Sequence, residues 1–452
     1  MSSTDNLLHA LRNWGRQPAG ELLVRLGVSR ATLMRAVQAL GPQVISLGQA
    51  RRTAYAARRP VRTRWDPLPL YRIDDSGQPH EVALLAPLHP AGCALQWREA
   101  CPWPLDPSMA DGWFDGLPYP LDDARPQGFL GRHFARRHAA LMQVPSDPLQ
   151  WSDDDALHAL SLLGTDLPGC YVLGEPALRA WLERSQQPPP PITDDTWPDA
   201  YARLAAAALS HGDPASSAGG EFPKFTATRE SGGEWRHVLV KFSGADGSPT
   251  SQRWSDLLVC EHLASRALAG RLGIPTAASR LLQAAGRTYL EAQRFDRHGA
   301  LGRSPVCTWA ALNAGLFGLP SPSWLPGAQA LQARGWISVQ TQEVIARVWH
   351  FGRLIANTDM HEGNLAFRPG LQLAPVYDML PMRYAPARAA EVVTPAFAPP
   401  LPLPAERAAW REALPAAQAF WAMAADDARI SDDFREVCAR NASELERLSA
   451  RA

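Results

Sequence analysis

The segment that most constrains this chain is the polar stretch N-T-D-M-H-E-G-N at residues 357–364, which is followed by P-V-Y-D at residues 375–378. It places Asp359 and Asn364 five residues apart, with Asp378 a short distance downstream. In phosphoryl transfer, one carboxylate orients the attacking hydroxyl, while an amide and a second carboxylate hold Mg²⁺ on the nucleotide. The spacing therefore predicts the catalytic half of a phosphotransferase site.

The flanking sequence predicts how these polar groups are held. Residues 345–355 are apolar at helical spacing, and residues 371–376 are typical of a short strand. The polar groups would then lie at the ends of elements, where a scaffold can fix them. The alternative is a polar surface loop in which Asp378 caps a turn, because the D-x-x-x-x-N spacing alone is weak evidence. A phosphotransferase site also needs a nucleotide-binding half elsewhere in the chain.

The lysines indicate where that half lies. The chain has 45 Lys and Arg residues, of which only Lys224 and Lys241 are lysines. Because arginine takes the place of lysine almost everywhere in this chain, the two remaining lysines mark positions where a compact ammonium is needed and a planar guanidinium does not suffice. The alternative is that both lysines remain on the surface by chance. Residues 238–242, V-L-V-K-F, predict a strand with Lys241 inside it. A kinase carries its phosphate-contacting lysine on such a strand.

A glycine-containing segment, A-S-S-A-G-G-E-F-P-K-F, precedes this strand at residues 215–225. Gly219 and Gly220 would let backbone N–H groups approach phosphate closely, and Lys224 would add positive charge. Clusters of Ser and Gly also mark flexible loops, which is the alternative interpretation.

The elements after Lys241 complete the expected order. Residues 255–272 predict an amphipathic helix ended by G-I-P at residues 273–275. Glu261 in this helix is placed to pair with Lys241, although an exposed helical glutamate is the alternative. Residues 288–297 predict a strand that leads to a hinge. The whole order predicts an α+β, bilobal protein-kinase-like fold.

The segments S-S-A-G-G-E-x-P-K-F, R-F-D-R, N-T-D-M-H-E-G-N and L-A-P-V-Y-D-M resemble HipA-family serine/threonine kinases, the toxin kinases of bacterial toxin–antitoxin systems. The similarity covers roughly residues 63–440, and the preceding N-terminal segment is similar to that of the YjjJ-type branch. One departure is that Gln293 stands where the family motif usually has Glu.

The resemblance implies ATP and Mg²⁺ as cofactors and autophosphorylation of a loop serine. It implies these residue roles: Asp359 as catalytic base with His361 in the catalytic loop, Asn364 and Asp378 as Mg²⁺ ligands, Lys241 on the ATP phosphates, Gln293, Phe295 and Asp296 around adenine and ribose, and Ser216 or Ser217 as the phosphorylated serine. It also implies a protein substrate of the translation machinery, such as an aminoacyl-tRNA synthetase, and either a separate antitoxin or a fused DNA-binding domain that takes its place. A DNA-binding regulator with a catalytically silent kinase fold, or a small-molecule kinase, are the alternatives.

The N-terminal segment differs in charge from the rest of the chain. Residues 1–62 contain 10 Arg against only Asp5 and Glu21 as acids, which is a local charge of about +8 in a chain of formal net charge zero. Such asymmetry favours a polyanion partner.

The same segment predicts a helix-turn-helix. Helices are expected at residues 6–14, 19–26 and 30–40, with Gly27 in the turn and Ser29 as N-cap. The second helix of such a motif enters the DNA major groove. The expected DNA contacts are Arg30, Thr32, Arg35 and Gln38 on the last helix, and Arg51 and Arg52 on a hairpin or wing that starts at Val44. A helical protein-interaction module is the alternative.

We therefore expect four domains, at residues 1–62, 63–190, 191–300 and 301–452, with the proline run at 187–191 as a stiff linker. A hydrophobic content of 46% suits two or three cores. The sequence shows no run of 18 apolar residues and no signal segment, which favours a cytoplasmic protein without a membrane span. Six scattered cysteines without C-x-x-C spacing argue against a zinc site or a disulfide framework.

Overall fold

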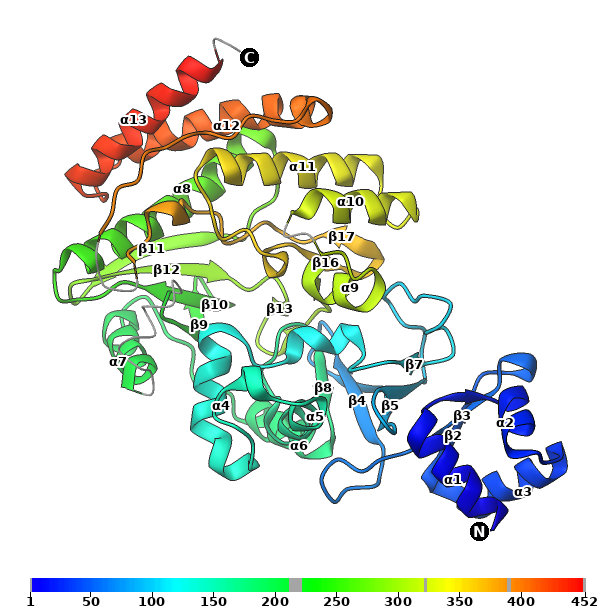
Figure 1. Cartoon of the computed structure of the whole chain (residues 1–452). Coiled ribbons are helices and arrows are strands. Elements are labelled where there is room, and N and C mark those ends of the chain that lie inside the picture. Colours follow the sequence, from blue (N-terminus) through cyan, green and yellow to red (C-terminus); the bar gives the residue numbers. More distant parts are fainter. Residues whose placement is uncertain (1, 211–221, 321–322, 388–391, 450–452) are drawn as a thin grey trace. The chain divides into compact units, whose positions relative to one another are not determined.

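The computed structural model describes residues 2–210, 222–320, 323–387 and 392–449 (Figure 1). It divides into two compact units. The first comprises residues 1–74, 78–125 and 150–187, and the second comprises residues 75–77, 126–149 and 188–452. Helix α4 (Gly128–Met142) thus belongs to the second unit, although it lies between two stretches of the first in sequence.

The first unit begins with three helices and a small sheet. These elements are α1 (Ser3–Trp14), β1 (Gln17–Pro18), α2 (Ala19–Leu26), α3 (Arg30–Leu40), β2 (Val44–Leu47) and β3 (Ala54–Ala57). Gly27 ends α2 with a φ of 62°, and the Ser29 hydroxyl caps α3 by accepting from the Thr32 N–H at 3.2 Å. The limits of α2 and α3 therefore lie where they were predicted, whereas α1 begins at Ser3, three residues before its predicted start, because Ser2 is its N-cap. Their shared core is formed by Leu7, Leu11, Leu22, Leu33 and Leu40.

A five-stranded antiparallel sheet forms the rest of the first unit, in the order β7-β6-β5-β4-β8. Its strands are β4 (Leu68–Ile73), β5 (Pro79–Pro87), β6 (Cys93–Trp97), β7 (Trp113–Phe114) and β8 (Tyr171–Leu173), with helices α5 (Asp153–Leu163) and α6 (Glu175–Gln186). The Arg59 N–H donates to Pro87 O at 3.0 Å and the His89 N–H donates to Ala57 O at 2.9 Å. These bonds join the sheet to the β2–β3 hairpin.

In the second unit, a four-stranded antiparallel sheet forms a small lobe, in the order β11-β12-β10-β9. The elements are α7 (Trp197–Ser210), β9 (Lys224–Ser231), β10 (Glu234–Phe242), α8 (Pro249–Leu272), β11 (Ser279–Ala284) and β12 (Arg287–Gln293). Val238, Val240 and Phe242 pack with Tyr201 of α7. Because side chains alternate along a strand, Lys241 projects from the opposite face, toward α8.

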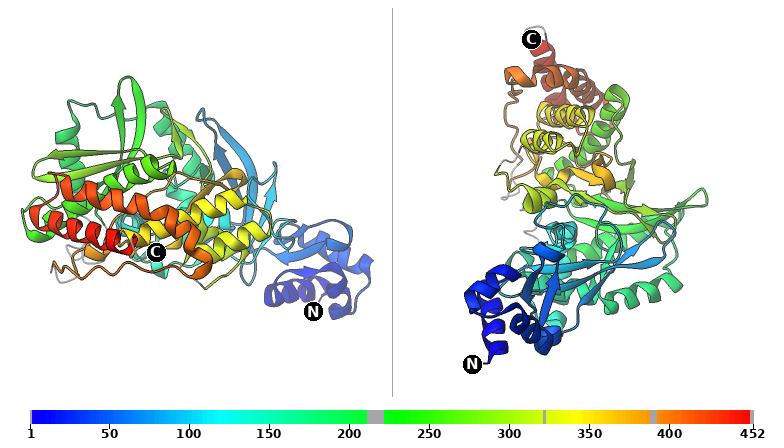
Figure 2. Two further views of the ribbon diagram at one scale, coloured as in Figure 1. Left: turned by 90° about the horizontal axis from the view of Figure 1, so that it is seen from above. Right: turned by 90° about the vertical axis from the view of Figure 1, so that its right-hand side faces the viewer.

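The large lobe of the second unit is mainly helical. Its elements are β13 (Arg297–His298), β14 (Gly302–Arg303), β15 (Cys307–Thr308), α9 (Trp309–Leu316), α10 (Trp324–Ala333), α11 (Val339–Leu354), β16 (Ala366–Arg368), β17 (Gln372–Leu373), α12 (Arg407–Asp426) and α13 (Asp432–Ser449). Helix α12 lies between α11 and α13 (Figure 2), and the Trp421 indole N–H donates to Leu354 O at 3.0 Å. Within the described ranges, no helix is long and apolar enough to cross a membrane.

Candidate active site

The centre of the candidate site is a buried ion pair between strand β10 and helix α8. Lys241 Nζ lies 2.7 Å from both carboxylate oxygens of Glu261, and the two residues are 3% and 5% exposed. Lys241 Nζ also contacts a carboxylate oxygen of Asp378 and lies over the Phe222 ring, 5.7 Å from its centroid. The lysine predicted from composition and the glutamate predicted from helix position therefore meet, and Asp378 joins them from the large lobe.

Asp378 is held by a connection between the two lobes. The Val376 N–H donates to Pro275 O and the Ala277 N–H donates to Val376 O, both at 2.9 Å. This bridge fixes the chain two residues before Asp378, which itself adopts a φ of 62°. A left-handed backbone is unfavourable for a residue with a Cβ and persists only when its surroundings impose it.

The three charges determine one another's ionisation. Burial opposes the charge of Lys241, but the carboxylates of Asp378 and Glu261 outweigh it and raise the pKa of the lysine above its ordinary value. Burial raises the pKa of Glu261, against the opposing effect of Lys241. Burial acts in the same direction on Asp378, but Lys241 and Lys224 hold its pKa below the ordinary value. Asp378 is therefore kept ionised, as a cation ligand must be.

The candidate catalytic loop, residues 357–364, follows the end of α11. The Asn364 side-chain N–H donates to Asp359 O at 2.9 Å, and the Asp359 N–H donates to the Asn357 side-chain oxygen at 3.0 Å. Asn364 is buried and Asp359 is exposed. One N–H of the Asn364 amide is thus bonded within the loop, which fixes the direction of its side-chain oxygen. An amide oxygen is a ligand suited to Mg²⁺.

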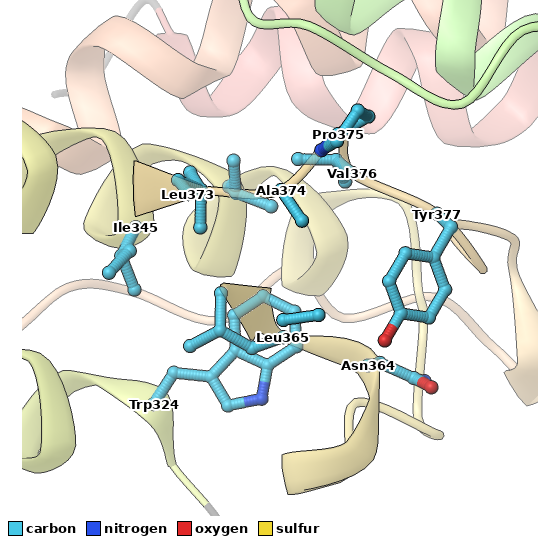
Figure 3. Close-up of a pocket in the computed structure, with 11 residues that line it drawn as sticks. Trp324, Ile345, Asn364, Leu365, Leu373, Ala374, Pro375, Val376 and Tyr377 are labelled. Carbon is cyan, nitrogen blue, oxygen red and sulfur yellow. The ribbon is translucent and has the colours of Figure 1, made fainter. Parts of the chain in front are cut away.

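Tyr377 fastens the segment that carries Asp378 to the catalytic loop. Its hydroxyl donates to Gly363 O at 2.5 Å, and its ring lies 5.8 Å from that of Phe295. Figure 3 shows Tyr377 and Asn364 at the end of a small pocket whose remaining walls are apolar. The volume of this pocket is about 10 Å³, which is room for one water molecule and too little for a nucleotide.

The residues predicted around adenine and ribose lie at the end of strand β12 and directly after it. Gln293 is the last residue of the strand, and its N–H donates to Ala278 O at 2.8 Å. Asp296 is buried and accepts from Arg294 at 3.1 and 3.2 Å and from Arg297 at 2.6 Å. Phe295 thus lies next to Tyr377, whose hydroxyl is bonded to Gly363 of the loop. The Asp296 carboxylate, in contrast, is bonded to two arginines.

The remaining predicted residues lie at the edges of the site. His361 accepts at its Nδ1 from the Gly363 N–H at 3.1 Å, and Lys224 is the register partner of Lys241 on the adjacent strand. Gly219, Gly220, Ser216 and Ser217 lie outside the described residues.

The predicted DNA contacts of the first unit are distributed over α3 and the hairpin. Arg30, Arg35 and Gln38 are exposed on α3, while Thr32 is half-buried against the Ser29 cap. On the hairpin, Arg51 and Arg52 are also exposed, and Arg52 lies 3.4 Å from Asp111. Five of the six predicted residues are therefore exposed, and DNA binding remains a prediction.

Sequence reasoning missed two residues that organise the site. Asn357 stood inside the motif but received no role, and Phe222 under Lys241 was not singled out. An Asn that follows a predicted helix and lies two residues before Asp359 was the signal available for the first. For the second, the short Gly–Lys segment offered only an aromatic residue next to a proline.

Comparison with known proteins identifies the family of this chain. The family described as "HipA-like C-terminal domain" matches residues 216–446, and the family described as "YjjJ-like toxin, middle domain" matches residues 64–182. Toxin YjjJ of Escherichia coli (strain K12) is 38% identical over 94% of this chain and 93% of its own length. The chain belongs to the HipA-like toxin family, in its YjjJ-type branch.

A solved structure of the same family agrees with the fold. The HipA chain from the Shewanella oneidensis MR-1 complex of HipA, HipB and operator DNA matches with a TM-score of 0.51 at 14% identity. The match covers 84% of this chain and 95% of that one. The HipA-like fold is therefore confirmed for this YjjJ-type chain.

Proposed function

We propose that this protein is an ATP- and Mg²⁺-dependent serine/threonine protein kinase of the HipA type. The observation that carries the proposal is the meeting of Lys241, Glu261 and Asp378 from three separate elements. A scaffold gains little from burying a lysine between two carboxylates, because the cost of desolvation offsets most of the attraction. A nucleotide site needs that lysine held in place, which is what the pair with Glu261 supplies.

The residues present fit a bound Mg²⁺. No cluster of three or more His, Cys, Asp or Glu side chains suited to a metal occurs among the described residues. Mg²⁺ on a nucleotide needs only one or two protein ligands beside the phosphates and water, and Asn364 with the ionised Asp378 provides them. When bound, the metal would neutralise charge on the phosphates.

The chain's own groups would then act by position and charge. Lys241 would contact the ATP phosphates, held by Glu261 in the orientation that the strand gives it. Asp359 would accept a hydrogen bond from the substrate hydroxyl and orient its oxygen toward the phosphorus. Catalysis by such a site comes mainly from orientation and electrostatics, so the loss of one group is costly.

Incubation of the full chain with ATP and Mg²⁺, followed by intact-mass measurement, tests the activity. Wild type gains phosphate, while Asp359→Ala gains none and keeps the wild-type melting temperature, because Asp359 is exposed. Glu343→Ala, which removes an exposed carboxylate from α11 in the same lobe, serves as the control and retains transfer. Phosphate gain by a folded Asp359→Ala protein would contradict the assignment.

Autophosphorylation on Ser216 or Ser217 is the regulatory part of the proposal. A phosphate there would add about −1.5 to −2 charge beside the place of the ATP phosphates, which disfavours nucleotide binding. Peptide mapping of phosphatase-treated and ATP-incubated protein locates the site. An undiminished gain of phosphate by a protein carrying Ser216→Ala and Ser217→Ala would refute it.

The partners follow from the same reasoning. We propose DNA binding through residues 1–62, on account of the exposed Arg30 and Arg35 of α3. The protein substrate would belong to the translation machinery, such as an aminoacyl-tRNA synthetase. An antitoxin would control the kinase. The kinase would act on its substrate in the cytoplasm. A small-molecule kinase would share this site chemistry, and screening purified acceptors with labelled ATP separates the two.

A further inference from the structure

Asn357 is anchored at a sharp turn of the chain. It is 6% exposed, and its backbone N–H donates to Gly352 O at 2.9 Å, at the end of α11. The residue before it, Ala356, adopts a left-handed φ of 60°. The side chain of Asn357 therefore leaves a fixed helix end in a single direction.

One carboxamide joins the two acidic segments of the site. The Asn357 side-chain oxygen accepts from the Asp359 N–H at 3.0 Å, and its side-chain N–H donates to Asp378 O at 3.3 Å. A carboxamide offers both an acceptor and a donor on one planar group. A carboxylate lacks the donor, and a serine hydroxyl is too short to reach from one segment to the other.

The backbone of Asp359 is thereby held on both sides. Asn357 binds its N–H, and the Asn364 side chain binds its carbonyl oxygen at 2.9 Å. The left-handed Asp378 has its carbonyl oxygen bound by Asn357 in turn. Because backbone strain persists only where contacts impose it, these bonds fix the directions in which both carboxylates leave the chain.

We propose that Asn357 is a positioning residue that sets the placement of the hydroxyl-orienting Asp359 relative to the metal-binding Asp378. It touches neither substrate nor phosphate in this scheme. The inference rests on the proposed kinase function, because its consequence is the geometry of phosphoryl transfer. Small errors in that geometry are costly, since a displacement of about 1 Å can lower a rate by about 100-fold.

Steady-state kinetics of Asn357→Ala and Asn357→Ser test the proposal. We expect kcat of Asn357→Ala to fall by about 10- to 100-fold, with KM for ATP changing by less than about 3-fold, because Lys241 and Glu261 remain paired. Asn357→Ser keeps an acceptor for the Asp359 N–H and should fall in between. The matched control is Asn441→Ala, which removes another buried amide, 2.8 Å from the Tyr384 hydroxyl. It should lower the melting temperature without changing kcat.

Hydrogen exchange of the nucleotide-free protein gives a readout that does not depend on activity. Exchange in peptides that cover residues 355–361 should rise in Asn357→Ala and stay at the wild-type level in Asn441→Ala. Unchanged exchange there, or equal losses of kcat in both alanine variants, would overturn the positioning role. If wild type transfers no phosphate at all, the proposed function fails, while the exchange result still decides the role of Asn357.

Discussion

Replacing Lys241 by Met removes the charge at the centre of the site while keeping an unbranched side chain. The Glu261 carboxylate then remains buried without its ion-pair partner, and Asp378 loses the same partner. Breaking a buried ion pair by removing one member costs about 3–5 kcal/mol. Glu261 carries most of this cost, because its side chain is 7% exposed, whereas that of Asp378 is 31% exposed and partly solvated.

The cost should depend on pH, and its sign follows from Glu261. Burial already raises the pKa of this carboxyl, and Lys241 is the largest effect that lowers it. Without the lysine, the folded pKa rises further above the unfolded value, so the folded state binds more protons. Stability is then lost as the pH rises through the folded pKa. The difference between Lys241→Met and wild type should be largest at about pH 8 and smallest at about pH 5.

Calorimetric unfolding at these two pH values measures the effect. For a unit of this size, about 3–5 kcal/mol corresponds to a drop in melting temperature on the order of 10 °C at the higher pH. The double variant Lys241→Met, Glu261→Gln should recover much of the loss, since no unpaired charge is left between strand and helix. Arg236→Met is the control on the same strand, because its pair with Glu234 is about half exposed and worth less than about 1 kcal/mol. A Lys241→Met loss as small as that of the control, or one that does not vary with pH, would refute the reasoning.

Two further predictions concern packing and DNA. A Cβ at Gly327 would overlap the buried Trp309 ring, so Gly327→Ala should destabilise the protein by about 1–3 kcal/mol. A Cβ at the exposed Gly270 of α8 meets nothing within 4 Å, so Gly270→Ala should stabilise it by about 0.5–1 kcal/mol; melting temperatures that shift in the same direction would contradict this argument. Arg30→Ala and Arg35→Ala should each weaken DNA binding and reduce the slope of log affinity against log salt by about 1, as read by fluorescence anisotropy. An unchanged slope in both variants would exclude α3 as the phosphate-contacting helix.

Helix and strand identities were predictable where local signals act alone. The strand with Lys241 lies within β10, and the helix with Glu261 lies within α8. The predicted start at residue 255 was late, because α8 begins at Pro249 after the Ser248 N-cap, and a serine followed by proline was the missed signal. Likewise, α11 begins at Val339 after its own Ser338 cap, before the apolar spacing that was used to predict it.

Features that depend on distant parts of the chain were not predictable. The expected strand at residues 371–376 is reduced to β17, and Val376 instead bridges to Thr276 of the small lobe. The left-handed Asp378 is flanked by that bridge and has its carbonyl oxygen bound by Asn357, and the sequence around Asp378 signals neither contact. Periodicity locates elements, whereas the direction of a catalytic side chain is set by contacts between elements.

The contact between Lys241 and Asp378 explains how the chain can gather its acidic groups before any ligand arrives. Two carboxylates brought to one place repel each other, and burial alone would shift them toward the protonated form. The ammonium of Lys241 contacts both carboxylates. It keeps the pKa of Asp378 low and forms an ion pair with Glu261. In the proposed kinase, one lysine would therefore have two tasks, to contact phosphate and to keep the metal-binding Asp378 ionised. Arginine at position 241 would place a broad planar group where a single small cation now contacts both carboxylates. This difference accounts for a lysine at position 241 in a chain that otherwise uses arginine almost throughout.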